Sequence, residues 1–163
     1  MDQQCKLYML IGVPGSGKST WHCDQEWLQE AAYISTDRYV EEYAKNMGKT
    51  YSEVFAEVMP KCIDYMIGDI VHAREAGQDI VWDQTSTSVS ARAKKLRMAP
   101  VHYTKIAVVF ETPRKDVHDK FLNRPGKKIP SEVIQNMISN FVYPSVSEGF
   151  DKVIIAKLKG INQ

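Results

Sequence analysis

Short apolar runs alternate with longer amphipathic stretches along this chain. The runs predict buried parallel strands, because strands covered on both faces of a sheet carry nearly continuous apolar residues. Five such runs occur, at 6–11, 33–35, 79–83, 105–110 and 152–156. Helices are expected between them, over 18–30, 38–47, 52–76 and 88–98, and then from residue 113 and from residue 130 or 131. This alternation predicts an α/β fold with a five-stranded parallel sheet, right-handed crossovers and helices on both faces.

The longest expected helix, 52–76, carries an apolar stripe at three- and four-residue steps. Such spacing is typical of a helix face packed on the core, and not of a cofactor-binding motif. The stripe consists of Val54, Phe55, Val58, Cys62, Tyr65, Met66, Ile70 and Val71. Pro60 is expected to kink or divide this helix, and Gly77 to end it.

The size and charge of the chain limit what it can be. Its 163 residues correspond to one domain, so residues 1–163 are expected to form a single unit. A composition that is 44% hydrophobic and 25% charged is that of an ordinary globular protein. The formal net charge is +1, from 21 basic and 20 acidic residues. A global field that holds nucleic acid is therefore excluded, and any basic surface must be local.

The cysteines and the N-terminal residues indicate the compartment. Cys5, Cys23 and Cys62 are odd in number and lack CxxC spacing, which argues against a disulfide framework and against a structural zinc site. The apolar run before Gly12 is too short for a signal peptide. No apolar run approaches the ~20 residues of a membrane helix. We expect a cytoplasmic protein without membrane contact.

One motif carries a strong chemical signal. Gly12-Val-Pro-Gly-Ser-Gly-Lys18-Ser19 matches the P-loop pattern GxxxxGK[ST], and it follows an apolar strand and opens a helix, as the motif requires. Its glycines let backbone N–H groups reach phosphate oxygens. Lys18 reaches the β- and γ-phosphates, and Ser19 offers its hydroxyl to Mg²⁺. ATP with Mg²⁺ is the expected ligand pair, and GTP is the alternative. The residues expected to contact the nucleotide are Gly12, Pro14, Gly15, Ser16, Gly17, Lys18, Ser19 and Thr20.

Two acids follow predicted strands, at the sheet edge where ligands bind in parallel α/β folds. Asp83 ends the strand 79–83 and is a candidate for holding the magnesium ion. Its alternatives are an exposed strand-end acid or a helix cap. Asp37 follows the strand 33–35 and is a candidate for accepting the proton of an attacking hydroxyl. As a helix N-cap, Asp37 would look the same in sequence, and one residue can serve both roles.

A loop rich in glycine, proline and basic residues is expected over 123–130, between two helices. It contains Arg124, Lys127 and Lys128. Catalysis of phosphoryl transfer rests on positioning and on cations around the γ-phosphate. The loop is therefore predicted to be a mobile lid, with Arg124 on the phosphates of ATP and active in catalysis. The alternative is an ordinary solvated turn.

Taken in order along the chain, these motifs resemble the kinase domain of the polynucleotide 5′-hydroxyl kinases, found in a bacteriophage end-healing enzyme and in its animal counterparts. The matching segments, within about 7–143, are Gly12-Val-Pro-Gly-Ser-Gly-Lys-Ser-Thr-Trp21, Ser35-Thr-Asp37-Arg-Tyr39, Asp83-Gln-Thr85 and Arg124-Pro-Gly-Lys-Lys-Ile-Pro130, which leads into Val133. The resemblance implies an adenylate-kinase-like, three-layer P-loop fold. It also implies that Lys18, Asp37 and Arg124 carry catalysis, with Asp37 as the general base. Residues expected to contact the acceptor are Asp37, Arg38, Asp83 and Thr85.

One position departs from the family pattern. The bacteriophage enzyme has an arginine three residues after the base, which holds the phosphate 3′ of the attacked hydroxyl, and this chain has Val40 there. Arg38 is the nearest remaining cation. The other local cations lie in the helix 88–98: Arg92, Lys94, Lys95 and Arg97. Such a helix is usually just solvated, but its start near the strand ends makes part of its surface a candidate to flank the acceptor. The phosphatase domain of the family has no counterpart in these residues.

Three functions remain open at this point. The first is ATP-dependent transfer of the γ-phosphate to the 5′-hydroxyl end of DNA or RNA. The second is a kinase of a small-molecule or tRNA-linked hydroxyl on the same scaffold. The third is a nucleotide-binding switch that signals by its bound state. The absence of a guanine-reading NKxD motif and the presence of Asp37 favour transfer over a switch. The oligomeric state stays open.

Overall fold

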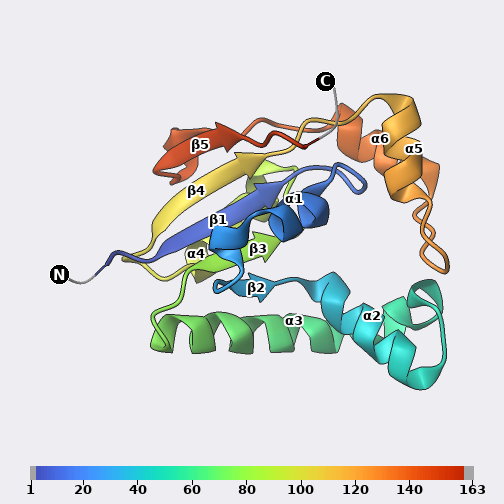
Figure 1. Ribbon diagram of the computed structural model, residues 1–163, viewed down its shortest axis with the longest axis horizontal. Coiled ribbons are helices and arrows are strands. Elements are labelled where there is room, and N and C mark those ends of the chain that lie inside the picture. The colour runs from blue at the N-terminus through green and yellow to red at the C-terminus, as the bar shows by residue number, and fades with distance from the viewer. Residues whose placement is uncertain (1–2, 160–163) are drawn as a thin grey trace.

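The computed structural model describes residues 3–159 and contains a five-stranded sheet whose neighbouring strands are all parallel (Figure 1). The strand order is β2-β3-β1-β4-β5. The strands are β1 (Lys6–Ile11), β2 (Ala32–Ile34), β3 (Ile80–Asp83), β4 (Thr104–Val109) and β5 (Lys152–Ile155). Each agrees with its predicted run to within one residue at either end, which confirms the α/β fold with a parallel sheet.

Helices cover both faces of this sheet. The odd-numbered residues of β1 from 7 to 11 belong to one hydrophobic core, and residues 8 and 10 belong to a second. The first core is completed by α3 (Tyr51–Glu75) and α4 (Val89–Met98), and the second by α1 (Lys18–Asp24) and the 3₁₀ helix η1 (Glu26–Leu28). The sheet is therefore the middle one of three layers.

Three of the remaining helices gather at one edge of the sheet (Figure 1): α2 (Thr36–Met47), α5 (Lys115–Leu122) and α6 (Ser131–Ser139). The 3₁₀ helix η2 (Val146–Glu148) lies beside α4 instead, because Glu148 pairs with Arg92. In Figure 1 the strand arrowheads point to the right, toward α2 and toward the segment 123–130 that connects α5 to α6. The carboxyl ends of the strands thus face the segments that were expected to bind ligands.

Three helices differ from expectation in their extent. The segment 18–30 is divided at Gln25, whose extended ψ of 92° separates α1 from η1. Pro113 lies two residues before α5, which begins at Lys115. Pro60 does not divide α3, which runs through it. The carbonyl that loses its amide partner belongs to Ala56, and both residues are exposed, so water can replace the missing bond.

The apolar stripe of α3 is narrower than its sequence pattern suggests. Its buried members lie at steps of four residues and are Val54, Val58, Cys62, Met66 and Ile70. Phe55, Tyr65 and Val71 are 40%, 57% and 39% exposed, so their assignment to the core was wrong. Each is next in sequence to a buried position, about 100° around the helix. Within residues 3–159, even this longest helix lacks the apolar length needed to cross a bilayer.

Candidate active site

The P-loop turns between β1 and α1 in a conformation that requires glycine at two positions. Gly15 and Gly17 have φ angles of 74° and 93°, in the left-handed region that other residues avoid. Gly17 directly precedes α1, so the loop leads into the first turn of that helix. The amide of Gly12 donates to the carbonyl of Thr85 at 2.9 Å. This bond ties the start of the loop to the segment that follows β3.

The Lys18 side chain is buried and folds back over the P-loop. Its Nζ donates to the carbonyl oxygens of Gly12, at 2.9 Å, and Val13, at 3.0 Å. Burial lowers the pKa of Lys18 to about 8, and the charges of Asp83 and Asp37 oppose this shift only in part. An anion beside the ammonium would raise this pKa again. The position of Lys18 therefore favours a negatively charged ligand.

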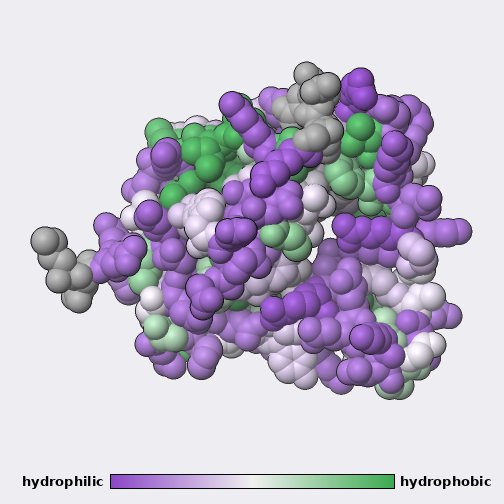
Figure 2. Space-filling view, in the orientation of Figure 1, coloured by the Kyte–Doolittle hydropathy of each residue, from purple (hydrophilic) through white to green (hydrophobic). Residues whose placement is uncertain are grey.

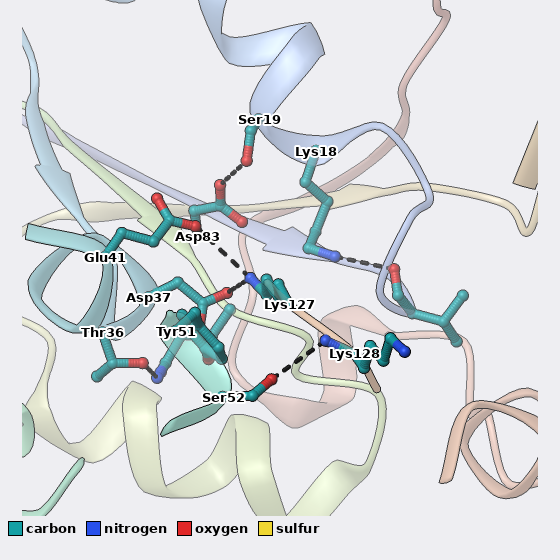
Figure 3. A network of polar contacts seen from close by, with 12 residues as sticks. Lys18, Ser19, Thr36, Asp37, Glu41, Tyr51, Ser52, Asp83, Lys127 and Lys128 are labelled. Carbon is teal, nitrogen blue, oxygen red and sulfur yellow. Dashed lines mark hydrogen bonds and ion pairs between the residues drawn. The ribbon is translucent and has the colours of Figure 1, made fainter. Parts of the chain in front are cut away.

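Asp83, the last residue of β3, accepts two hydrogen bonds on one carboxylate oxygen. One donor is Ser19 Oγ, 3.0 Å from Oδ2 (Figure 3). The other is the Tyr33 hydroxyl of β2. Burial and then the charge of Asp83 raise the pKa of Tyr33, so its hydroxyl stays protonated and acts as a donor. A hydroxyl and a carboxylate are oxygen ligands of the kind that Mg²⁺ prefers. Ser19 and Asp83 therefore fit a magnesium ion bound next to the P-loop.

Asp37 lies in the first turn of α2, where Ser35 and not Asp37 is the N-cap. Each of its carboxylate oxygens accepts one hydrogen bond (Figure 3): the Tyr51 hydroxyl lies 2.5 Å from Oδ1, and Lys127 Nζ lies 3.0 Å from Oδ2. Burial raises the pKa of Asp37, but the charge of Lys127 and both hydrogen bonds outweigh it, so the pKa is lowered. Asp37 is an ionised carboxylate at neutral pH.

The segment 123–130 connects α5 to α6 and rests on the start of α3. The carbonyl of Gly126 accepts from the amide of Ser52 at 3.2 Å, and the amide of Lys128 donates to Ser52 Oγ at 3.2 Å. The backbones of Arg124 and Lys127 form an isolated antiparallel β-bridge, so the tip of the segment is a tight turn. These contacts bring the basic loop down onto the α2–α3 side of the sheet edge.

Lys127 of this loop contacts the acids of α2. Its side chain is only 11% exposed, and its Nζ lies 3.7 Å from Glu41 as well as within bonding distance of Asp37. The same ammonium lies 4.4 Å from the centre of the Tyr51 ring, a cation–π contact. One lysine of the loop is thus paired with two carboxylates and one aromatic ring of α2 and α3.

A cavity of about 710 Å³ opens where these segments meet. In Figure 2 the surface is hollowed between the body of the sheet and the hydrophilic right-hand side, where Figure 1 has the segment 123–130. The predicted residues that line the cavity are Pro14, Gly15, Gly17, Lys18, Ser19, Thr20, Asp37, Arg38, Asp83, Thr85 and Arg124. Gly12 and Ser16 are buried and do not line it.

Sequence reasoning missed the aromatic and apolar residues of this cavity. Tyr33 and Tyr51 hold the two acids, and they belong to no motif. Phe55 and Met59 of α3, together with Val133 of α6, also line the cavity. The one signal in the sequence was the four-residue step from Tyr51 to Phe55 and Met59, which is typical of a single helix face.

The basic helix α4 does not border the cavity. Arg92 is fully buried: its Nε lies 2.8 Å from Glu148 Oε1, and its Nη1 donates to the carbonyl of Ser86 at 3.0 Å. Burial, followed by the charges of Arg92 and Lys94, lowers the pKa of Lys95 to about 8. The expectation that these cations flank the acceptor is therefore wrong, because the helix packs on the core and Arg92 fixes the loop after β3.

A P-loop with a buried lysine, whose serine bonds to a strand-end aspartate at the carboxyl edge of a parallel sheet, is typical of a class, the P-loop kinase-like proteins. Within that class, residues 7–144 match the AAA domain family, and the chain belongs to this family.

Solved structures with the same fold include several kinases. A putative kinase from Chloroflexus aurantiacus has a TM-score of 0.66 and 17% identity, over 94% of this chain and 85% of that one. A gluconokinase from Sinorhizobium meliloti has a TM-score of 0.53 and 16% identity, over 94% and 83%. A shikimate kinase from Acinetobacter baumannii has a TM-score of 0.50 and 14% identity, over 96% and 86%. At these identities the likeness concerns the fold, and it gives no support to a nucleic-acid acceptor.

Proposed function

We propose that this protein transfers the γ-phosphate of ATP to a hydroxyl group of a small molecule, with Asp37 as the general base. One observation carries the proposal. The ionised Asp37 lines the same cavity as the P-loop lysine and the cations of the segment 123–130. A nucleotide switch needs one carboxylate for Mg²⁺, a role that Asp83 can fill, whereas transfer to a hydroxyl also needs a second carboxylate that takes the proton.

The P-loop side of the cavity suits the donor. Lys18 would compensate the charge of the β- and γ-phosphates once it exchanges the carbonyls of Gly12 and Val13 for phosphate oxygens. Ser19 and Asp83 would hold Mg²⁺, which when bound neutralises charge on the phosphates. Arg124, whose side chain lines the cavity from the loop, is our candidate for stabilising the phosphoryl group as it moves.

The chemical step is a single displacement. The acceptor oxygen forms a bond to the γ-phosphorus and gives its proton to Asp37, while the bond from the γ-phosphorus to the bridging oxygen breaks. ADP leaves with that electron pair. Each Asp37 oxygen accepts one hydrogen bond and has a second lone pair for the acceptor hydroxyl. We expect Lys127 to move from Asp37 toward the phosphoryl group, because it belongs to the proposed lid and the phosphoryl group offers it a competing anion.

Two features favour a small acceptor over a nucleic-acid end. Val40, which stands where the polynucleotide kinases have their acceptor arginine, is fully buried and packed in a hydrophobic cluster. Arg38, the neighbouring cation, lies 3.4 Å from Asp69 of α3 and is engaged there. The gluconokinase and the shikimate kinase that share this fold are, by their names, kinases of small molecules.

The test is a transfer assay with γ-labelled ATP and a panel of acceptors. The panel contains small alcohols and polyols, nucleosides, and 5′-hydroxyl DNA and RNA, since the motifs resemble polynucleotide kinases. We expect labelled product with a small alcohol, and none with Lys18→Ala, which loses charge on the phosphates while the core is untouched. Transfer chiefly to 5′-hydroxyl ends would replace the proposed acceptor. ATP consumption that survives Lys18→Ala would contradict the proposal itself.

A further inference from the structure

The cavity also indicates the chemical class of the acceptor. Resting on the proposed function, we infer that the acceptor is a neutral alcohol with an aromatic or alicyclic body, whose apolar body lies against side chains of α3 and α6 while its hydroxyl meets Asp37.

The first wall of this acceptor site is a row of side chains on α3. Tyr51, Phe55 and Met59 all line the cavity and follow one another at steps of four residues, so they share one helix face. The Tyr51 and Phe55 rings lie 5.6 Å apart at an angle of 40°. Because the Tyr51 hydroxyl donates to Asp37, this row begins at the base and continues away from it.

The second wall comes from the loop and from α6. Ile129 precedes α6, and Val133 and Met137 lie one turn apart on that helix, and all three line the cavity. Phe55 and Val133 are 40% and 41% exposed, which is high for large apolar side chains. Apolar groups left exposed in a concave site, beside a few polar groups that fix orientation, are typical of a small-molecule pocket.

The charges around this end of the cavity argue against an anionic acceptor. Asp37 and Glu41 are both carboxylates. The cations next to these acids are already paired: Lys127 is shared between the two acids, and Arg38 is paired with Asp69. Arg124 and Lys128 also line the cavity from the loop, and we assign them to the phosphates of ATP. A carboxylate or phosphate on the acceptor would therefore meet two like charges and would compete with ATP or with an existing pair for a cation. A neutral body avoids both costs.

The test uses neutral alcohols and their charged counterparts in the labelled-ATP assay. Benzyl alcohol is compared with 4-(hydroxymethyl)benzoate, and cyclohexylmethanol with 4-(hydroxymethyl)cyclohexanecarboxylate; gluconate and a 5′-hydroxyl oligothymidylate complete the set. We expect kcat/KM for the neutral member of each pair to exceed that of its carboxylate by about tenfold or more, because an unpaired carboxylate would be desolvated in the site. Higher kcat/KM for the carboxylates, gluconate or the oligonucleotide would overturn the inference and leave the phosphotransferase standing.

Variants of the α3 row separate binding of the acceptor from binding of ATP. Phe55→Ala should raise the acceptor KM about tenfold, as the loss of an apolar pocket contact does, while the KM for ATP stays unchanged and Phe55→Leu restores most of the loss. Ile63→Ala is the matched control, because Ile63 is 45% exposed on the same helix and does not line the cavity. Equal effects of Phe55→Ala and Ile63→Ala would overturn the inference.

A binding measurement decides the case in which no alcohol of the set is phosphorylated. The fluorescent neutral alcohol 1-naphthalenemethanol is titrated into the protein with Mg²⁺ and a non-hydrolysable ATP analogue. Binding that weakens about tenfold in Phe55→Ala, and not in Ile63→Ala, supports the apolar site. Absence of binding, or equal affinity in all three proteins, overturns it. Loss of ATP consumption in Lys18→Ala is scored separately and tests the proposed function alone.

Discussion

Tyr51 helps to set the pKa of Asp37, after the burial of the carboxyl group and the charge of Lys127. Its hydroxyl donates to Oδ1 at 2.5 Å and helps to lower the pKa of the carboxylate. Its ring lies beneath the Lys127 ammonium. We regard Tyr51 as a positioning residue, because it acts through Asp37 and Lys127 and not on the reacting atoms.

The substitution Tyr51→Phe tests this role. It keeps the ring beneath Lys127 and removes the hydrogen bond to Asp37. The pKa of Asp37 should then rise, and since the base works as a carboxylate, the acid limb of the kcat–pH profile should move to higher pH. A shift of roughly one pH unit is expected, because a hydrogen bond to a charged group contributes about 1.5 kcal/mol. Tyr43→Phe is the control, since Tyr43 bonds to Glu57 outside the cavity. An unmoved acid limb in Tyr51→Phe would refute the role.

The second residue-scale prediction concerns Lys18, whose pKa is lowered to about 8 mainly by burial. Above that pH the free protein carries a largely neutral Lys18, whereas bound phosphates favour the ammonium. Binding of ATP should therefore take up protons above about pH 8, and its affinity should fall as the pH rises further. Calorimetry in buffers of different ionisation enthalpy measures the uptake. Lys18→Met should abolish it, and equal uptake by both proteins would contradict the assignment.

At the scale of elements, the contact between the segment 123–130 and α3 depends on Gly126. Its φ is 74°, and a Cβ there would lie 2.9 Å from the Cβ of Thr50. Gly48 offers a matched position, with φ 65° and no atom within 4 Å of an added Cβ. The two glycines differ in their surroundings and not in their backbone conformation.

Alanine at each position gives the corresponding prediction. Both variants should lose stability by about 1 kcal/mol, the cost of a left-handed non-glycine residue. Only Gly126→Ala should also lower the transfer rate, because the loop can no longer rest on α3 and bring its cations to the cavity. Thermal unfolding and initial rates are measured side by side. Equal rates for Gly126→Ala and Gly48→Ala would show that docking of the loop does not matter for transfer.

The elements themselves were largely predictable, because their signals are local. Short apolar runs gave five strands to within a residue, and the glycine pattern gave the turn at Gly15 and Gly17. Helix extents were harder. The sequence pattern predicted that Phe55 belongs to the core, because it is part of an apolar stripe. The buried row of this helix instead runs through the neighbouring residue Val54. Which face of a long helix is buried depends on the helix and sheet that pack against it. The apolar pattern of the helix itself does not show where those neighbours lie.

At the scale of the whole molecule, the site is assembled from segments far apart in sequence. Tyr33 reaches Asp83 across 50 positions, and Lys127 reaches Asp37 across 90. A local sequence pattern cannot predict contacts between residues so far apart in the chain. The same holds for Arg92, which resembled a solvated cation in sequence and is buried against Glu148, 56 positions away. The P-loop could be recognised because its residues form one continuous segment. Tyr33 and Lys127, which bond to the two acids of the site, come from distant segments, so their roles were missed.

The central claim is that Asp37 and the P-loop act together to move a phosphoryl group to a hydroxyl. Its most direct test is the rate of acceptor-dependent transfer from γ-labelled ATP in the wild-type protein and in Asp37→Asn. The amide can still accept from Tyr51, so the melting temperature and the affinity for ATP should change little. The transfer rate should fall by about 10²–10⁴-fold, the usual value of general-base catalysis. A transfer rate close to that of the wild type, with ATP still bound and the fold intact, would contradict the account.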